Sequence, residues 1–246
     1  MRHSLLVAVA VLGAACDEPA MTTRPDALVQ ASPDAASDGA SMLMGFGDLS
    51  GMCGVLDTEL TEATPSLVRA TMTFARQYDD DVDRPLLTLG GLHLAETPNA
   101  GGSSGLSEIF AYEQLERCEQ AALYKTETEI IYDIVGKITD LEVTLDGEKI
   151  GVSVVRAQTY PLGTPYTLSA ATALLKKKLD GILLSTANVS AGDRWRKQIL
   201  SVLAYDQQAA DMFEQAWGTL SSTTRADTIV VITQTDGEDL FIYTNM

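Results

Sequence analysis

The pattern of apolar positions along the chain predicts a domain in which helices and strands follow one another. Apolar residues recur on one side of segments that we expect to be helices, at residues 58–78, 106–119, 167–179 and 207–220. Shorter apolar or alternating runs predict strands at residues 86–95, 123–133, 139–145, 149–157, 181–185 and 227–234. Tight hairpins are predicted at Asp146-Gly147 and Asp236-Gly237, the second one closing with residues 240–243. Residues 195–205 fit either a strand or a helix.

The order of these elements predicts an α/β fold. A helix is followed by a three-strand meander, a second helix and a further strand, with a helix and a hairpin added at the C-terminus. We therefore expect a mixed sheet with flanking helices. Residues 48–246 are enough to bury a core of their own, so we expect them to form a single domain.

The first residues predict export. A short basic start is followed by an apolar run from Ser4 to Ala15, and Cys16 comes directly after it. The run is shorter than the roughly 20 apolar residues that span a bilayer, and its layout is typical of a signal peptide over residues 1–15. Small residues before a cysteine resemble the lipobox of bacterial lipoproteins, although Gly13 stands where that pattern prefers leucine. The resemblance implies a lipid on Cys16 that anchors the protein to the bacterial cell envelope; ordinary cleavage after Ala15 is the alternative.

Residues 16–47 are dominated by Ala, Ser, Asp and Pro, and no period connects their few apolar side chains. Such a segment buries too little apolar surface to offset the entropy lost on ordering it. We expect a disordered tether between the lipid and the domain, with a root-mean-square span of roughly 30 Å.

The chain is acidic, with a formal net charge of −17. An acidic surface repels polyanions, so we do not expect nucleic acid as a partner. Basic residues are in local excess between residues 167 and 200, where Lys176–Lys178 is interpreted as a solvated helix face rather than an anion site. The sequence does not identify a protein partner.

Two cysteines remain after Cys16. An oxidising exported compartment allows Cys53 and Cys118 to pair. A disulfide needs their Cα atoms to lie within roughly 4.4–6.8 Å of each other. Two buried free thiols are the alternative.

The first predicted hairpin places acidic side chains on one face of the sheet. With a two-residue turn at residues 146–147, Asp140 lies opposite Ser153. Because side chains alternate along a strand, Asp140, Glu142, Ser153 and Val155 share this face. The valines and leucines between them form an apolar face on the other side.

The element order and these acids resemble the PD-(D/E)XK nuclease-like superfamily, whose core is a helix, a three-strand meander, a helix and a strand. In active members, an acid on the first helix, an Asp on the second strand and an acid-x-Lys on the third bind a metal and activate water. The resemblance implies that Glu108 is the first acid and Asp140 the strand Asp. The third-strand motif falls on Ser153-Val154-Val155, which has neither acid nor lysine. Glu142 is the acid best placed to replace the missing ligand.

These features lead to three candidate functions. The expected one is a lipid-anchored envelope protein whose nuclease-like domain binds or scaffolds without catalysis and without a cofactor. The second is a nuclease or phosphodiesterase that depends on Mg²⁺ or Mn²⁺ held by Glu108, Asp140 and Glu142. The third is a purely structural envelope lipoprotein. The missing lysine argues against the second function, because its charge would position the attacking water and stabilise phosphoryl oxygens.

Overall fold

A mixed β-sheet forms the centre of the domain. The computed structural model describes residues 44–99 and 104–244, which belong to one compact unit. The strands of this part of the chain are β1 (Asp48–Gly51), β2 (Ser66–Phe74), β3 (Ala122–Thr126), β4 (Leu141–Leu145), β5 (Glu148–Ala157), β6 (Lys197–Ala204) and β7 (Ile229–Gly237). They form one seven-stranded sheet in the order β1-β2-β7-β6-β5-β4-β3. The four central strands are parallel, whereas β1 at one edge and β4 and β3 at the other pair antiparallel.

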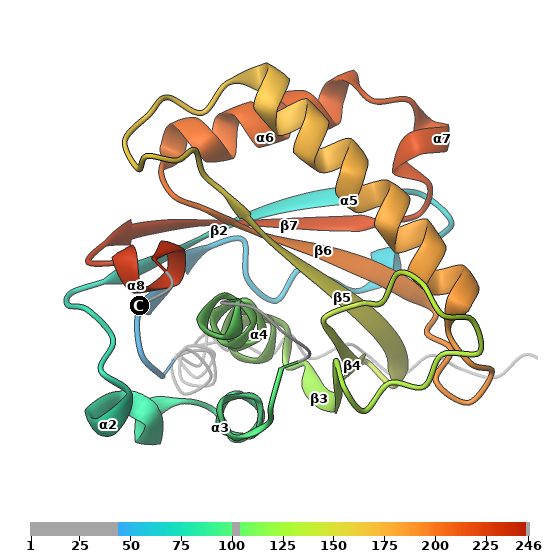
Figure 1. The fold of residues 1–246 in the computed structure, drawn as a ribbon, viewed down its shortest axis with the longest axis horizontal. Helices are drawn as coiled ribbons and strands as arrows, with labels where there is room; N and C mark the ends of the chain where they lie inside the picture. The colour runs from blue at the N-terminus through green and yellow to red at the C-terminus, as the bar shows by residue number, and fades with distance from the viewer. Residues whose placement is uncertain (1–43, 100–103, 245–246) are drawn as a thin grey trace, which may run out of the picture. The chain divides into compact units, whose positions relative to one another are not determined.

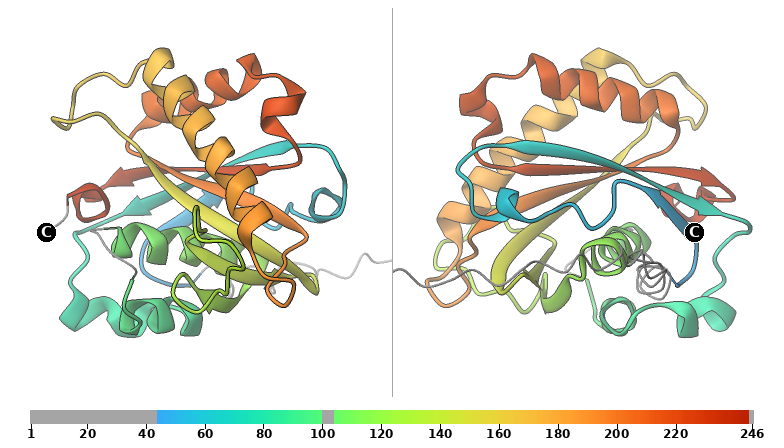
Figure 2. Two further views of the ribbon diagram at one scale, coloured as in Figure 1. Left: turned by 45° about the vertical axis from the view of Figure 1, so that its right-hand side comes forward. Right: turned by 180° about the vertical axis from the view of Figure 1, so that it is seen from behind.

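Helices cover both faces of this sheet (Figure 1). On one face lie α5 (Leu168–Asn188) and α6 (Gln207–Thr219), and on the opposite face lie α4 (Gly105–Glu119) and α3 (Leu89–Glu96). The two views of Figure 2 show the same three layers. Shorter helical turns are η1 (Thr58–Leu60), α2 (Asp80–Asp83), η2 (Arg84–Leu86), α7 (Ser222–Arg225) and α8 (Leu240–Tyr243). The predicted α/β fold with a mixed sheet and flanking helices is confirmed.

The central strands are covered on both faces, which explains their almost continuous apolar sequences. Every residue of β6 is buried. Leu175 of α5 and Phe213 of α6 belong to the core on one face, and Leu115 of α4 belongs to the core on the other. Among the described helices, none is both long and apolar enough to cross a bilayer.

The boundary between the predicted tether and the domain lies earlier than expected. The predicted signal peptide, Cys16 and most of the tether fall within residues 1–43, which are outside the described residues. Phe46 lies within the predicted tether, but it is buried against the rings of Phe74 and Tyr78. The packed domain therefore includes at least this end of the segment.

The first hairpin forms as predicted. Leu141 pairs with Val152 in the register expected from a two-residue turn. Asp146 and Gly147 both have positive φ, 49° and 80°, as this turn requires. Asp140 therefore stands directly before β4, where the strand begins.

The helix predicted at residues 58–78 is wrong, because residues 66–74 of this segment form strand β2. Its buried residues are Val68, Ala70, Met72 and Phe74, which recur at every second position. This alternation is that of a strand. The strand lies between β1 and β7, where its backbone groups find partners on both sides.

The strand predicted at residues 86–95 is also wrong, because this segment contains helix α3. The helix contains a glycine pair, Gly90-Gly91. A Cβ atom at Gly90 would overlap the hydroxyl of Tyr112, and one at Gly91 would overlap the carboxylate of Glu113. The glycines therefore allow α3 to lie close against α4.

Residues 181–185 do not form the predicted strand but continue helix α5. The buried stripe of Leu175 and Leu179 runs on through Ile182, so the helical period is unbroken. The strand that follows this helix is β6, which settles the open choice at residues 195–205.

The second predicted hairpin does not form. Strand β7 pairs with β2 as far as Gly237, which lies opposite Phe74. Residues 240–243 then form the short helix α8 instead of a returning strand. The strand predicted at residues 123–133 is shorter than expected, because β3 ends at Thr126.

Candidate functional site

Two acids that the sequence singled out, Glu108 and Asp140, meet in one cavity of about 480 Å³. The cavity lies along the last residues of β5, beyond the point where β4 ends its pairing. At this open edge Glu108 of α4 and Lys178 of α5 line the same cavity, although the two helices cover opposite faces of the sheet. The lining residues are Ser104, Ser107, Glu108, Asp140, Val154, Val155, Arg156, Gln158, Leu174 and Lys178.

The side chain of Asp140 pairs with a backbone group on the open edge of β5. Its Oδ2 accepts a hydrogen bond of 2.6 Å from the backbone N–H of Val154, and the hydroxyl of Ser153 is a further partner. Burial raises the pKa of the Asp140 carboxyl, and the positive charge of Lys178 opposes this rise. The predicted pairing of Asp140 with Ser153 across the hairpin is therefore present in the site.

Glu108 lies in the first turn of α4 and is only 6% exposed. Its Oε1 accepts hydrogen bonds from the hydroxyl of Ser104 at 2.6 Å and from the side-chain amide of Asn99 at 3.1 Å. Burial raises the pKa of Glu108 to about 7, the Ser104 hydrogen bond opposes the rise, and the charge of Asp140 adds to it. Near neutral pH this carboxyl is thus divided between its protonated and ionised forms.

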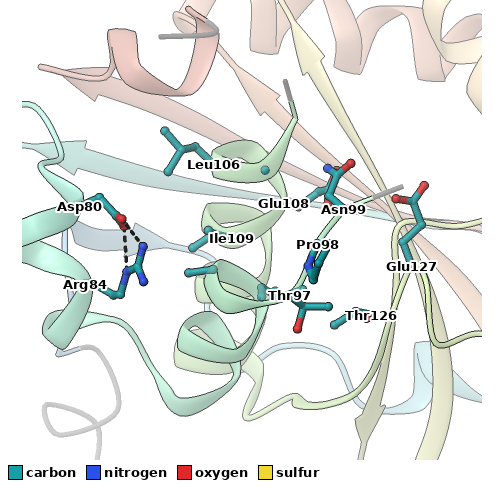
Figure 3. A pocket seen from close by; sticks show the side chains of 13 residues that line it. Asp80, Arg84, Thr97, Pro98, Asn99, Leu106, Glu108, Ile109, Thr126 and Glu127 are labelled. Atoms are coloured by element: carbon teal, nitrogen blue, oxygen red, sulfur yellow. Dashed lines mark hydrogen bonds and ion pairs between the residues drawn. The ribbon is translucent and has the colours of Figure 1, made fainter. Parts of the chain in front are cut away.

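Glu108 also lines a second cavity, of about 330 Å³. Figure 3 shows Glu108 and Asn99 on one side of this cavity, near Glu127, and the ion pair of Asp80 with Arg84 on the other side. Glu108 therefore borders two cavities at once. It is the acid that lines both of them.

Lys178 brings a positive charge into the first cavity, whereas the sequence predicted a solvated helix face for Lys176–Lys178. The two preceding lysines are exposed, but Lys178 is partly buried, and its Nζ donates a hydrogen bond of 2.5 Å to the carbonyl oxygen of Val154. A pattern in the sequence could have indicated this. Lys178 follows the buried Leu175 by three residues and precedes the buried Ile182 by four, so the helical period puts it on the core side.

Glu142 does not line this cavity. It is fully buried in a separate cluster, where its Oε1 is 3.7 Å from the Nζ of Lys149. Burial raises the pKa of Glu142, and the charge of Lys149 opposes the rise. An ion pair of 2.7 Å between Lys125 and Asp193 belongs to the same cluster. Glu142 is therefore not placed to join Glu108 and Asp140 around one ion.

The residues of the cavity fit a divalent cation poorly. Within residues 44–99 and 104–244, no group of three or more His, Cys, Asp or Glu side chains could hold a metal ion. The carbonyl oxygen of Val154 is already bonded to Lys178, whose ammonium group repels a second cation. Mg²⁺ and Mn²⁺ prefer oxygen ligands, and here only Glu108 and Asp140 offer carboxylates.

Cys53 and Cys118 are joined by a disulfide, with their Cα atoms 4.6 Å apart. The bond connects the segment after β1 to the last turn of α4. It therefore fixes the C-terminal end of the helix whose first turn carries Glu108.

Comparison with known proteins gives little about function. No protein-family model matches the chain, and no solved structure matches it. A Dictyostelium discoideum protein described as AAC-rich mRNA clone AAC4 protein is 41% identical over 165 residues, which are 63% of this chain and 24% of the relative. The chain thus spans about a quarter of the length of the curated relative it matches. The relative's description names neither an activity nor a ligand.

Proposed function

We propose that the domain binds a partner without catalysis, on a nuclease-like fold, in a protein that an N-terminal lipid anchors to the bacterial cell envelope. The order α4, β3, β4, β5, α5 and β6 supports the nuclease-like fold, because it repeats the helix, meander, helix and strand of the PD-(D/E)XK core. The apolar run that ends at Cys16 supports the anchor.

The contacts of Asp140 and Lys178 with Val154 support the non-catalytic part of the proposal. Strand β4 pairs with β5 only as far as Val152. Val154 lies two residues further along the same edge, so no strand supplies partners for its N–H and C=O there. Asp140 accepts from that N–H, and Lys178 donates to that C=O. Unpaired buried backbone groups are costly, so these two charges serve the stability of the sheet edge. Ser153 and Val155 stand where active relatives of this fold carry the acid and the lysine.

A metal-dependent nuclease or phosphodiesterase is the competing function. Lys178 favours it, because its ammonium group lies near Asp140 and Glu108 and supplies the charge that Val155 lacks. The poor fit of the cavity to a divalent cation weighs against it.

An incubation with single- and double-stranded DNA and RNA in Mg²⁺ or Mn²⁺ separates these two functions. We expect no cleavage by the full chain. Cleavage that is lost in Asp140→Asn but kept in Asp146→Asn would overturn the proposal, because Asp146 is an exposed carboxylate in the nearby hairpin turn.

Binding at the cavity is tested by photo-crosslinking in the cell envelope. Gln158 lines the cavity, and Tyr160 is exposed two positions further along. With a photoreactive residue in place of Gln158, we expect a discrete crosslinked partner that is absent when Tyr160 is replaced. Equal or no crosslinking at both positions would favour the purely structural envelope lipoprotein.

The anchor is tested by fractionating cells that produce the Cys16→Ser variant. We expect the parent protein in the membrane fraction and the variant released or incorrectly processed, because the variant has no thiol to carry the lipid. Identical fractionation of both proteins would rule out lipidation of Cys16 as the means of attachment.

A further inference from the structure

A loop between β3 and β4 exposes an unusual number of large aliphatic side chains. In residues 131–138, which we call the apolar loop, the exposed fractions are 60% for Ile131, 56% for Ile134, 103% for Val135 and 42% for Ile138. Single exposed apolar residues are common on protein surfaces, but a group of them marks an interaction site.

The apolar loop is held firmly against the end of helix α5 (Figures 1 and 2). The backbone carbonyl of Asn188 accepts hydrogen bonds from the N–H groups of Asp133 and Ile134, at 2.9 and 3.3 Å. The side-chain amide of Asn188 donates to the carbonyl of Lys137 at 3.0 Å. A Cβ atom at Gly136 would come within 2.7 Å of that amide nitrogen, so glycine permits this close approach. Backbone polar groups thus bond to the domain, while the aliphatic side chains stay exposed.

The apolar surface continues onto α5. Leu184 lies one helical turn before Asn188, on the same side of the helix, and is 52% exposed. Leu183 beside it is 45% exposed. The end of α5 and the apolar loop therefore present aliphatic side chains at one end of the domain.

The size and charge of this surface favour a lipid bilayer over a protein partner. A stable protein interface buries about 800 Å² and about 20–30 residues on each partner, whereas the exposed aliphatic side chains of this surface are four on the loop and two on α5. A bilayer needs no complementary surface and accepts each aliphatic side chain separately. Asp133 and Lys137 offset each other, so the loop is neutral on a chain whose net charge is −17. Lys137 has a stem long enough to keep its charge among lipid headgroups.

We propose that the apolar loop inserts into the interface of a lipid bilayer and orients the domain on the membrane. The pairing of the loop backbone with Asn188 suits this role, because unpaired N–H and C=O groups are costly in an apolar medium. The insertion goes beyond the lipid anchor proposed above and does not depend on it. A lipid at Cys16 would only keep the loop near the bilayer.

Fluorescence from a labelled loop tests this proposal in the full chain. Cys16→Ser removes both the lipid and the competing thiol, and Cys53 and Cys118 are already joined. Val135→Cys then carries an environment-sensitive nitrobenzoxadiazole label, and Tyr160→Cys, at a position that is 90% exposed elsewhere on the domain, carries the same label as the matched control. With phosphatidylcholine vesicles we expect a shift to shorter wavelengths and quenching by nitroxide lipids at position 135, and neither at position 160.

A second substitution keeps the test independent of the label. Ile134→Ser is expected to reduce the quenching at position 135 several-fold, whereas Leu89→Ser, at an exposed leucine of α3, is expected to leave it unchanged. The proposal is overturned if position 135 shows no quenching by nitroxide lipids. A spectral shift that appears without vesicles as the protein concentration rises would also overturn it and would identify a second copy of the chain as the occupant.

Discussion

The chemistry of individual residues in this protein depends on their surroundings more than on their type. Glu108 is a carboxylate in the first turn of a helix, a position that is usually solvated and ionised. Here the turn faces a cavity shared with Asp140, so burial raises the pKa of Glu108 to about 7. Lys178 is one of three consecutive lysines, but only its ammonium group bonds to the open edge of β5. Both residues owe these properties to the cavity that they line.

The raised pKa of Glu108 makes the stability of the domain depend on pH. The carboxyl has an ordinary pKa of 4.5 and a folded-state pKa of about 7, so the folded state binds the proton more tightly. Stability from this group is complete below pH 4.5 and is lost as the pH rises to about 7. Glu108→Gln cannot ionise, so we expect it to be more stable than the parent at pH 8 by roughly 3 kcal/mol at most, with little difference at pH 4.

Urea unfolding at pH 4 and pH 8 measures this difference. Glu96→Gln is the matched control, because Glu96 is exposed at the end of α3 and we expect its replacement to have the same small effect at both pH values. A Glu108→Gln variant that is less stable than the parent at pH 8 would contradict the assignment of burial as the cause.

At the scale of elements, α4 uses its polar side chains to fasten the segments around it. Both carboxylate oxygens of Glu119 accept backbone N–H groups of residues 54–56, at 2.9–3.1 Å. Arg117 donates to the carbonyls of Phe46 and Gly47. Buried polar side chains are tolerated when they are paired in this way. The helix thus positions both the start of the domain and the cavity that Glu108 borders.

Removal of the Glu119 carboxylate should loosen the segment after β1. Glu119→Ala leaves the N–H groups of residues 54–56 without their acceptor, so we expect a loss of about 2–4 kcal/mol in the free energy of unfolding. Glu119→Gln retains one carbonyl oxygen and should lose less. Chemical denaturation of both variants beside Glu96→Ala measures the effect, and a loss equal to that of the exposed control would disprove the role of the carboxylate.

At the scale of the whole molecule, the sheet joins distant parts of the chain. Strand β2 is placed next to β7, the last strand, so one edge of the sheet is complete only when the C-terminal segment is in place. The disulfide of Cys53 and Cys118 closes a loop with a sequence separation of 65. This loop contains β2 and α3, two elements whose conformation the local pattern did not predict correctly.

Reduction of this disulfide should lower the stability of the domain substantially. In the chain-entropy description, a loop of this length corresponds to about 4 kcal/mol. We therefore expect a lower melting temperature for the Cys53→Ser/Cys118→Ser variant and for the parent in reductant, with the two effects equal. An unchanged melting temperature in reductant, with both thiols reactive in the native protein, would show that the bond does not form in solution.

The sequence by itself determined the features whose causes are local. Asp146-Gly147 dictates a two-residue turn, and the turn dictates the register that places Asp140 opposite Ser153. The helical periods of α4 and α6 and the general α/β class followed from the same kind of short-range pattern. The candidate acid Glu108 came from the resemblance to the nuclease-like superfamily, and the structure places it in one cavity with Asp140.

Only the tertiary structure decided the features that depend on distant partners. β2 is a strand because β1 and β7 pair with its two edges, and α3 is a helix that its glycines bring close to α4. The cavity exists because β5 extends beyond the last residue that pairs with β4. Side chains of α4 and α5, which cover opposite faces of the sheet, meet at this unpaired edge. The helical period indicates that Lys178 faces the core, but packing between layers decides which side chains it meets there. The same packing places Glu142 in a separate cluster beside Lys149.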